Sequence, residues 1–249
     1  MDIVGIIPAA GRGTRLGMPF SKELFPLPSG YSGKVTSPVI DFILERMRIA
    51  GATKIYTIIN TEKTDILAYL GSGSKFGLEI CYLIQEKARG MPDAINTVTR
   101  WIHSDTIILF GMPDTVFTPE NALNSILNLL LDSRADLVLG LFPTNKPHYF
   151  GMVEFDENYR PLAFIDKPKS SNLKFFWGIG CWKFTFMRVI NQYIEENINS
   201  QKEMLLSDVF KFALYQNLDI LVYPFHEGKY YDIGIGSEIL GVIRSMLEA

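Results

Sequence analysis

Short apolar runs alternate with segments of helical periodicity along the first half of the chain. The run Ile3–Ala9 is almost entirely apolar, which is typical of a strand buried on both faces. Strand-like runs recur at 54–60, 78–84, 106–110 and 136–141, and helical patterns follow them at 62–70, 93–102 and 119–131. This alternation predicts a mainly parallel sheet with helices on both of its faces.

The first helix is expected to start at Ser37. A serine followed by Pro38 has the form of an N-cap with proline in the first turn, and apolar residues continue at helical spacing as far as Met47. Gly51 then supplies a stop.

The second half of the chain has shorter apolar runs. We expect strands at 151–155, 161–165, 175–182 and 220–223, and helices at 184–196, at 207–215 and from Ser237 onward. No repeat, low-complexity stretch or linker separates the halves. The chain is therefore expected to form one α/β domain over 1–249, with a three-layer, Rossmann-like sheet, an inserted β-rich layer and a division near residue 145 into halves 1–145 and 146–249.

Composition narrows the class of protein. Hydrophobic residues make up 47% of the chain and charged residues 20%, enough to bury a core. The net charge of −3 argues against a general nucleic-acid-binding surface. Two cysteines exclude a disulfide framework, and three scattered histidines form no metal cluster. Without a basic N-terminal region or an apolar run of about 18 residues, we expect a cytoplasmic protein with no membrane partner.

A glycine-rich loop follows the first strand. It contains Ala10, Gly11, Gly13, Thr14 and Arg15. Its glycines allow a sharp turn that brings amide N–H groups close to a ligand, and such clustered amides bind anions. The alternative is an ordinary surface turn with solvated basic side chains.

Two better-known phosphate loops do not fit. A Walker A loop requires Gly-Lys-Ser/Thr, which is absent here. The dinucleotide-binding fingerprint requires a small residue where Leu16 stands and an acid where Asn60 stands.

The loop continues into Ser21-Lys22-Glu23-Leu24. Together the two segments resemble the signature of the sugar-phosphate nucleotidyltransferases, which is a Gly-x-Gly-Thr-Arg loop followed by a Pro-Lys-x-Leu-type segment. The resemblance implies the nucleotide-diphospho-sugar transferase fold, with a nucleotide-binding half over 1–145 and a sugar-phosphate-binding half over 146–249. The spacing from Arg15 to Lys22 is shorter than in the thymidylyltransferases and closer to that of isoprenoid-pathway cytidylyltransferases.

Further positions match the family along the chain. Gln85 and Gly90 match a glutamine and a glycine that hold the pyrimidine base. The amide of Gln85 could serve the O4 and N3–H edge of uracil or thymine. Asp114 follows a buried strand and matches one metal-binding aspartate, and Asp232 matches the second. The resemblance therefore implies a Mg²⁺ ion held by Asp114 and Asp232.

The sugar-phosphate positions match less closely. Gly151 and Lys167 match a glycine of the sugar pocket and a lysine that holds the sugar phosphate. Asp166 stands where the family has a glutamate that contacts the sugar hydroxyls, and Trp177-Gly178 replaces Thr-Gly. The acceptor therefore need not be glucose-1-phosphate.

These residues suit one reaction, in which a phosphate oxygen attacks the α-phosphorus of a nucleoside triphosphate and releases pyrophosphate. The resemblance implies that the acceptor is a sugar-1-phosphate and that the nucleotide is dTTP or UTP. The resemblance implies that Arg15 neutralises the pyrophosphate, Lys22 stabilises the α-phosphate and Lys167 holds the acceptor. Such chemistry depends mainly on positioning and electrostatics.

Two alternatives stay open at this point. The short Arg15–Lys22 spacing and the altered sugar-pocket residues favour a cytidylyltransferase that acts on a non-sugar phosphate. A non-catalytic regulatory protein that binds a sugar nucleotide is the other. The sequence does not decide which sugar or nucleotide is used, or whether the chain forms a homo-oligomer.

Overall fold

The structure, a computed structural model, describes residues 2–11, 17–28 and 35–247. Its helices are α1 (Ile40–Ile49), α2 (Thr64–Leu70), α3 (Met91–Asn96), α4 (Ala122–Asp132), α5 (Phe184–Glu196), α6 (Leu206–Tyr215) and α7 (Gly236–Leu247). Its strands are β1 (Ile3–Pro8), β2 (Pro26–Pro28), β3 (Thr36–Pro38), β4 (Lys54–Ile59), β5 (Glu79–Ile84), β6 (Ile107–Gly111), β7 (Thr115–Thr118), β8 (Leu137–Pro143), β9 (Gly151–Phe155), β10 (Pro161–Asp166), β11 (Phe175–Lys183), β12 (Ile220–Pro224) and β13 (Lys229–Asp232).

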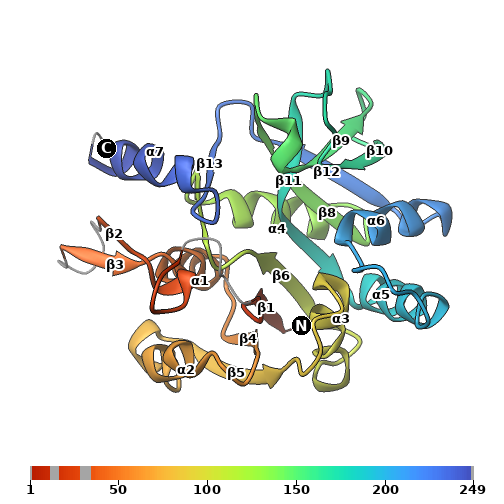
Figure 1. The fold of residues 1–249 in the computed structure, drawn as a ribbon. Coiled ribbons are helices and arrows are strands. Elements are labelled where there is room, and N and C mark those ends of the chain that lie inside the picture. Colours follow the sequence, from red (N-terminus) through yellow and green to blue (C-terminus); the bar gives the residue numbers. More distant parts are fainter. Residues whose placement is uncertain (1, 12–16, 29–34, 248–249) are drawn as a thin grey trace.

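A nine-stranded sheet forms the centre of the molecule (Figure 1). Its main path runs β10-β9-β11-β6-β1-β4-β5, and β8 pairs with β11 and carries β12 on its other side. Strands β6, β1, β4 and β5 are parallel to one another, as the strand–helix alternation predicts. Strand β11 joins them antiparallel to β6.

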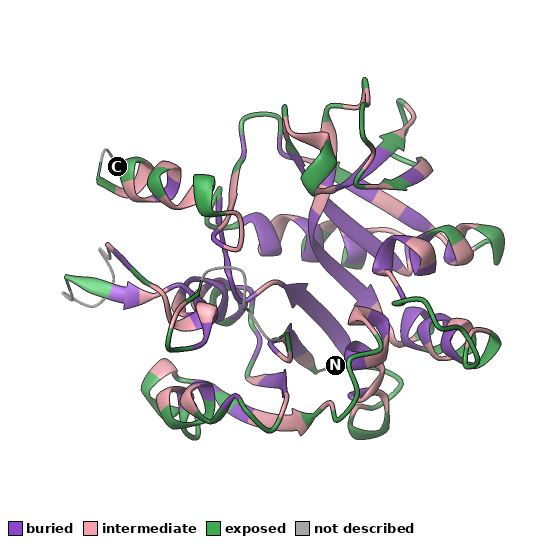
Figure 2. Cartoon of the chain, in the orientation of Figure 1, coloured by how far each residue is buried: buried purple, intermediate pink, exposed green. Residues whose placement is uncertain are grey.

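Helices cover both faces of this sheet, so that the molecule has three layers. Along β6, Ile107 and Leu109 belong to one apolar core, whereas Ile108 and Phe110 belong to the other. Helices α1, α2 and α4 pack on the first face, and α3, α5 and α6 pack on the second. The strands between them are buried along most of their length (Figure 2). The predicted α/β class and layer arrangement are confirmed.

The β-rich part of the second half branches from the same sheet. Strand β11 pairs antiparallel with β8, and its register shifts between Trp177 and Ile179. At that end, Phe176 pairs with Met152 of β9, and β9 pairs with β10. The layer that we expected as an insertion therefore extends one end of the central sheet.

The predicted start of the first helix is wrong. Ser37 and Pro38 lie in β3, where Ser37 pairs with Leu27 of β2. The helix begins instead at Ile40, after Val39. Asp41 in its first turn provides a negative charge that favours the helix N-terminus.

A two-stranded ribbon was not predicted at all. Strand β7 pairs antiparallel with β13, with Thr115 opposite Asp232. Helix α1 supports this ribbon, because Arg46 donates a 3.0 Å hydrogen bond to the carbonyl of Phe117 in β7. The ribbon joins a residue that follows the central strand β6 to one near the C-terminus.

Among the described helices, none has both the length and the apolar character that crossing a membrane requires.

Candidate active site

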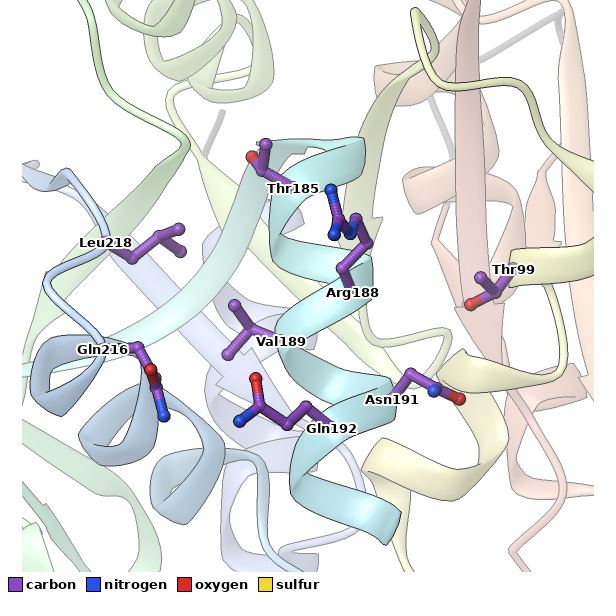
Figure 3. A pocket seen from close by; sticks show the side chains of 8 residues that line it. All are labelled: Thr99, Thr185, Arg188, Val189, Asn191, Gln192, Gln216 and Leu218. Atoms are coloured by element: carbon purple, nitrogen blue, oxygen red, sulfur yellow. The ribbon is translucent and has the colours of Figure 1, made fainter. Parts of the chain in front are cut away.

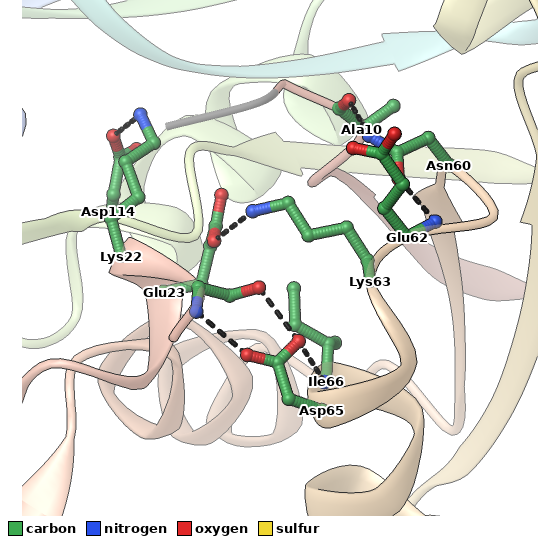
Figure 4. A network of polar contacts seen from close by, with 10 residues as sticks. Ala10, Lys22, Glu23, Asn60, Glu62, Lys63, Asp65, Ile66 and Asp114 are labelled. Carbon is green, nitrogen blue, oxygen red and sulfur yellow. Dashed lines mark hydrogen bonds and ion pairs between the residues drawn. The ribbon is translucent and has the colours of Figure 1, made fainter. Parts of the chain in front are cut away.

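Lys22 lies in a 3₁₀ turn, Lys22–Leu24, that is pinned to the start of α2 (Figure 4). The backbone N–H and the hydroxyl of Ser21 donate to Asp65 over 2.6 and 2.7 Å. Glu23 forms an ion pair with Lys63 over 2.8 Å, and the side chains are only 1% and 5% exposed. The residues on either side of Lys22 are thus fixed, and its ammonium group is directed to one place.

The two anchors differ electrostatically. Burial raises the pKa of Glu23, and the nearby Lys63 acts to lower it. A buried charge of this kind persists in a fold only when it is paired, because leaving it alone is costly. For Asp65, burial acts to raise the pKa, but the hydrogen bonds from Ser21 outweigh it and the pKa is lowered. The Asp65 carboxylate therefore stabilises the turn when it is ionised, whereas Glu23 holds the turn through its ion pair with Lys63.

Lys22 forms an ion pair with Asp114, which lies between β6 and β7 and is 2% exposed. Burial acts to lower the pKa of Lys22, but the carboxylates of Asp114, Glu23 and Asp232 raise it overall. The lysine therefore stays charged at neutral pH. The Lys22 bond occupies Oδ2 of Asp114, and no described residue donates a hydrogen bond to Oδ1.

Asp232 reaches the same place through the β7/β13 ribbon. The N–H of Ile233 donates to the carbonyl of Asp114 over 3.0 Å, and the N–H of Gly234 donates to Asp232 Oδ1 over 2.7 Å. A Cβ on Gly234 would lie 3.4 Å from Asp114 Oδ2 and 3.6 Å from Lys22 Nζ. One cation and two carboxylates thus meet around a position without a side chain.

This pair of carboxylates fits a magnesium ion. Mg²⁺ is usually held by one or two carboxylates together with water and substrate phosphates. Oδ1 of Asp114 is a buried anionic oxygen without a described partner, which a cation would satisfy. Within the described ranges, no cluster of three or more His, Cys, Asp or Glu side chains could hold a metal on its own. Substrate oxygens would therefore have to complete the coordination.

A pocket of 190 Å³ opens beside Lys22 and Asp114, and we refer to it as the first pocket. The predicted residues that line it are Ala10, Gly11, Lys22, Gln85, Gly90 and Asp114. Asn60, at the end of β4, donates to the carbonyl of Ala10 over 2.7 Å and so fixes the start of the glycine-rich loop. Asn60 therefore anchors this loop, at the position where a dinucleotide-binding protein would carry an acid.

Gln85 and Gly90 shape one wall of the first pocket. The Nε2 group of Gln85 donates to Asp93 over 2.8 Å and to the carbonyl of Gly90 over 3.3 Å. An amide nitrogen has two donors, so its Oε1 acceptor is the group left for a ligand. Gly90 has a φ of 111°, and a Cβ there would lie 2.1 Å from the carbonyl of Met204. Only glycine fits, and the reason is contact with the second half of the chain.

A second pocket, of 220 Å³, adjoins the first. The predicted residues that line it are Gly151, Asp166, Lys167, Trp177, Gly178 and Asp232. Aromatic side chains form much of its wall: the rings of Phe150 and Phe176 stack with centroids 4.0 Å apart, and Tyr230 donates to the carbonyl of Gly178 over 3.3 Å. Burial raises the pKa of Tyr230, so its phenol stays neutral.

Lys167 is exposed at this second pocket and has a strained backbone. Its φ of 42° lies in the left-handed region, which is uncommon for residues other than glycine. Its N–H donates to the carbonyl of Phe150 over 3.0 Å, which holds that conformation. Strain of this kind is often found at functional sites.

The two pockets share part of their lining, namely Met91, Met112 and Glu203. Glu203 was not predicted, because it lies in a polar stretch before α6 that has no motif or periodicity. Ser207, in the first turn of α6, was predicted only as part of a helix, yet it is 1% exposed and contacts Trp177 and Asp166.

Gly13, Thr14 and Arg15 lie outside the described residues, so the structure says nothing of their predicted positions. The other predicted site residues all line one of the two pockets. The predicted division at residue 145 stays a prediction, and both pocket linings contain residues from each side of it.

A larger hollow, of 470 Å³, lies elsewhere along α5, and Thr99 and the residues Gln216 and Leu218 that follow α6 also line it (Figure 3). Of the described residues that line it, Arg188 alone carries a charge, and the others, such as Asn191 and Gln216, are neutral. No predicted site residue is among them. Size therefore does not mark the site in this molecule, whereas convergence of charge does.

Comparisons with known proteins identify the family of the chain. The model of the family described as nucleotidyl transferase matches residues 4–248. The chain is 26% identical over 215 residues to glucose-1-phosphate thymidylyltransferase of Neisseria meningitidis serogroup A, serotype 4A, covering 84% of this chain and 70% of that enzyme.

Solved structures show the same fold at lower identity. A UDP-glucose pyrophosphorylase complexed with UDP-glucose superposes with a TM-score of 0.80 at 17% identity, covering all of this chain and 99% of the other. A UTP-bound UGPase of Acinetobacter baumannii superposes with a TM-score of 0.77 at 15% identity, covering all of this chain and 95% of the other. The predicted nucleotide-diphospho-sugar transferase fold is therefore confirmed. Because the family model spans nearly the whole chain, the chain belongs to the nucleotidyl transferase family, among the sugar-phosphate nucleotidyltransferases.

Proposed function

We propose that the protein joins dTTP or UTP to a sugar-1-phosphate, giving a nucleotide sugar and pyrophosphate. The first pocket then binds the nucleotide and the second binds the acceptor. One observation carries the proposal: Lys22, Asp114 and Asp232 meet around Gly234, where the two pockets adjoin. Two anionic substrates brought together there would need this concentration of charge.

The acceptor needs no general base. The second pKa of a phosphate monoester is near 6, so the attacking oxygen is already ionised at pH 7. The difficulty is repulsion between the two substrates and the charge that develops on the leaving pyrophosphate. Preorganised cations address both, since they are in place before the reaction starts.

Each basic residue has a separate task in this proposal. Lys22 is held in place by its pinned turn. It contacts the α-phosphate while the α-phosphorus becomes five-coordinate during the attack. Lys167, at the second pocket, holds the acceptor phosphate. Arg15 neutralises the pyrophosphate, for which its planar guanidinium is suited.

Asp114 and Asp232 would hold Mg²⁺ in this proposal. A bound Mg²⁺ would draw charge from the phosphate oxygens of both substrates. The ion pair with Asp114 keeps the charge of Lys22 beside the position that the α-phosphate would occupy.

The choice of base rests on Gln85. Because its two amide donors are engaged by Asp93 and Gly90, its free oxygen accepts a hydrogen bond from the base. The N3–H of uracil or thymine is such a donor. The UTP-bound and UDP-glucose-bound relatives support a uridine or thymidine nucleotide over a purine.

A second candidate is a cytidylyltransferase for a non-sugar phosphate. One observation favours it: Trp177 and Asp166 depart from the family at the acceptor pocket. The N4 amino group of cytosine could also donate to Gln85. A regulatory protein that binds a sugar nucleotide without turnover is the third. Such a protein would not need both Lys22 and two carboxylates at the junction of the pockets.

Pyrophosphate release in the presence of Mg²⁺ tests the proposal directly. Each of dTTP, UTP, CTP, ATP and GTP is combined with several sugar-1-phosphates, phosphocholine and polyol phosphates. Release with dTTP or UTP and a sugar-1-phosphate is the expected result and identifies both substrates. Release with CTP and a non-sugar phosphate alone would favour the cytidylyltransferase. No release, with a finished sugar nucleotide bound tightly, would favour the regulatory protein.

A further inference from the structure

Three side chains on three different elements form a hydrogen-bonded series beside the second pocket. The indole N–H of Trp177, on β11, donates to the hydroxyl of Ser207, on α6, over 3.2 Å. That hydroxyl donates in turn to Oδ1 of Asp166, at the end of β10, over 3.4 Å. All three residues line the pocket.

The direction of donation in this series is fixed by chemistry. An indole nitrogen can only donate and an ionised carboxylate can only accept, so the single proton of the Ser207 hydroxyl must point at Asp166. The 3.4 Å contact is longer than the usual O–H···O distance of about 2.7–2.8 Å. The hydroxyl therefore points at the carboxylate through a long hydrogen bond, and the carboxylate keeps acceptor capacity for a ligand.

The surrounding packing leaves the indole no other place. Its ring meets Phe210 edge-on, with centroids 5.2 Å apart and planes at 87°, and it lies 6.3 Å from the ring of Phe110. Ser207 is 1% exposed, and Trp177 is the donor that the fold supplies to its hydroxyl.

Gly151 makes room for this arrangement. It pairs with Asp166 across β9 and β10, and a Cβ on it would lie 2.3 Å from Trp177 Nε1 and 2.8 Å from Ser207 Oγ. Any side chain at 151 would thus occupy the space between the indole and the hydroxyl. The need for glycine here comes from the hydrogen-bonded series itself.

We propose that Trp177 and Ser207 are positioning residues that orient the Asp166 carboxylate toward a hydroxyl group of the acceptor. The inference rests on the proposed function and adds a determinant of acceptor specificity to it. Trp177 and Asp166, which depart from the family separately in sequence, act here as one unit. The acceptor must then present a hydrogen-bond donor, such as a sugar or polyol hydroxyl, in one direction, since a carboxylate can only accept.

The test compares Trp177→Phe, Ser207→Ala and the double variant with the wild-type protein. The substrates are the nucleoside triphosphate and the sugar-1-phosphate that give the highest turnover in the panel above. Each single variant is expected to raise KM for the acceptor about three- to tenfold, as for loss of one hydrogen bond. KM for the nucleotide should not change. The double variant should be no worse than the more affected single one, because both changes interrupt one series.

Trp182→Phe is the matched control. Trp182 lies on the same strand, contacts Phe110 and donates its N–H to the sulfur of Met187 over 3.2 Å, yet it does not line the pocket. Its variant should leave KM for the acceptor unchanged. Thermal unfolding is measured for every variant and identifies any that has lost its fold. If Trp177→Phe or Ser207→Ala is unfolded, the other single variant carries the test.

Different failures have different meanings. If the wild-type protein releases pyrophosphate but the variants keep its KM for the acceptor, the positioning role is wrong and the proposed function stands. The positioning role is also contradicted if KM for the acceptor and KM for the nucleotide rise equally, or if the effects of the two single variants add in the double variant. If the wild-type protein releases none with any acceptor, the proposed function fails and this inference fails with it.

Discussion

The two pockets are built in different ways, although they adjoin. The first is held by buried charge and backbone contacts: the Glu23–Lys63 pair under Lys22, the Asp65–Ser21 hydrogen bonds and the close fit of Gly90. The second is held by stacked aromatic rings and one hydrogen-bonded series. Charge fixes a group in one position, whereas aromatic walls can differ in shape between relatives.

This difference matches the division of labour in the proposed reaction. In the proposed reaction the α-phosphate meets the same cations whatever the acceptor is. We therefore expect the geometry of the first pocket to vary little between relatives. The acceptor differs from one enzyme to another, so the second pocket is the place where composition can change. The residue types of the family motifs are kept at the first pocket, although the spacing from Arg15 to Lys22 is short, whereas the residue types themselves change at Asp166 and Trp177 in the second.

The largest effect is expected from breaking the buried pair below the first pocket. Lys63→Met leaves the Glu23 carboxylate buried without its partner, which commonly costs about 3–5 kcal/mol of unfolding free energy. Urea unfolding measures it. The double variant Glu23→Gln/Lys63→Met should recover most of the loss. A loss below about 1 kcal/mol for Lys63→Met would mean that charge does not support this pocket.

Removing the charges where the pockets meet should lower turnover, and Lys22→Ala should in addition lower stability because it leaves the buried Asp114 without its partner. Lys22→Ala and Asp232→Ala are each expected to reduce kcat on the order of 100-fold, as for loss of one preorganised contact. Pyrophosphate release measures the effect, and thermal unfolding checks the fold. Arg188→Ala, in the larger hollow, is the control and should keep wild-type turnover. Near-wild-type turnover of both site variants would contradict the roles proposed for them.

A methyl group at Gly90 tests the backbone contact between the two halves. Gly90→Ala must accommodate a φ of 111° and a Cβ 2.1 Å from the Met204 carbonyl, so it should cost about 1–3 kcal/mol and weaken nucleotide binding. Gly11→Ala, where a Cβ meets no atom within 4 Å, is the matched control for stability. Calorimetric titration with UTP and urea unfolding measure the two quantities. Equal stability of the two variants would show that the contact is dispensable.

The smallest effect on stability is expected from lowering the pH. Asp65 has a lowered pKa in the folded protein, so its stabilisation is complete above the unfolded pKa of about 3.9 and is lost as the pH falls through the folded value. Asp65→Ala should therefore lower Tm at pH 7 and reduce its dependence on pH below about 4. Asp132→Ala, an exposed carboxylate at the end of α4, is the control. Parallel Tm curves for wild type and Asp65→Ala would contradict the assignment.

The sequence indicated the central fold because its signals are local. Period and length identified the strands that are buried on both faces, and β9 and α5 agree with the prediction to the residue. The predicted start of α1 was wrong, because Ser37 and Pro38 fit a helix N-terminus and a short strand equally well. Only pairing with β2 decides between them.

Candidate site residues could be predicted from the sequence where motifs are contiguous, as around Lys22. The family resemblance added Asp114 and Asp232. The β7/β13 ribbon that brings these two together was invisible, since it depends on pairing between distant segments. The contacts of Ser207 and Glu203 were missed for the same reason. Their chemistry comes from neighbours that the order of residues does not reveal.

The β7/β13 ribbon also bears on when the protein becomes competent. Lys22 and Asp114 are synthesised in the first half of the chain, but Asp232 is added with one of the last strands and reaches them only after β13 has paired. A nascent chain that has not yet reached β13 therefore cannot bring both carboxylates together, however well its earlier strands have folded. Competence is a property of the chain that has grown past β13, and a product truncated before that strand should be unable to perform the transfer.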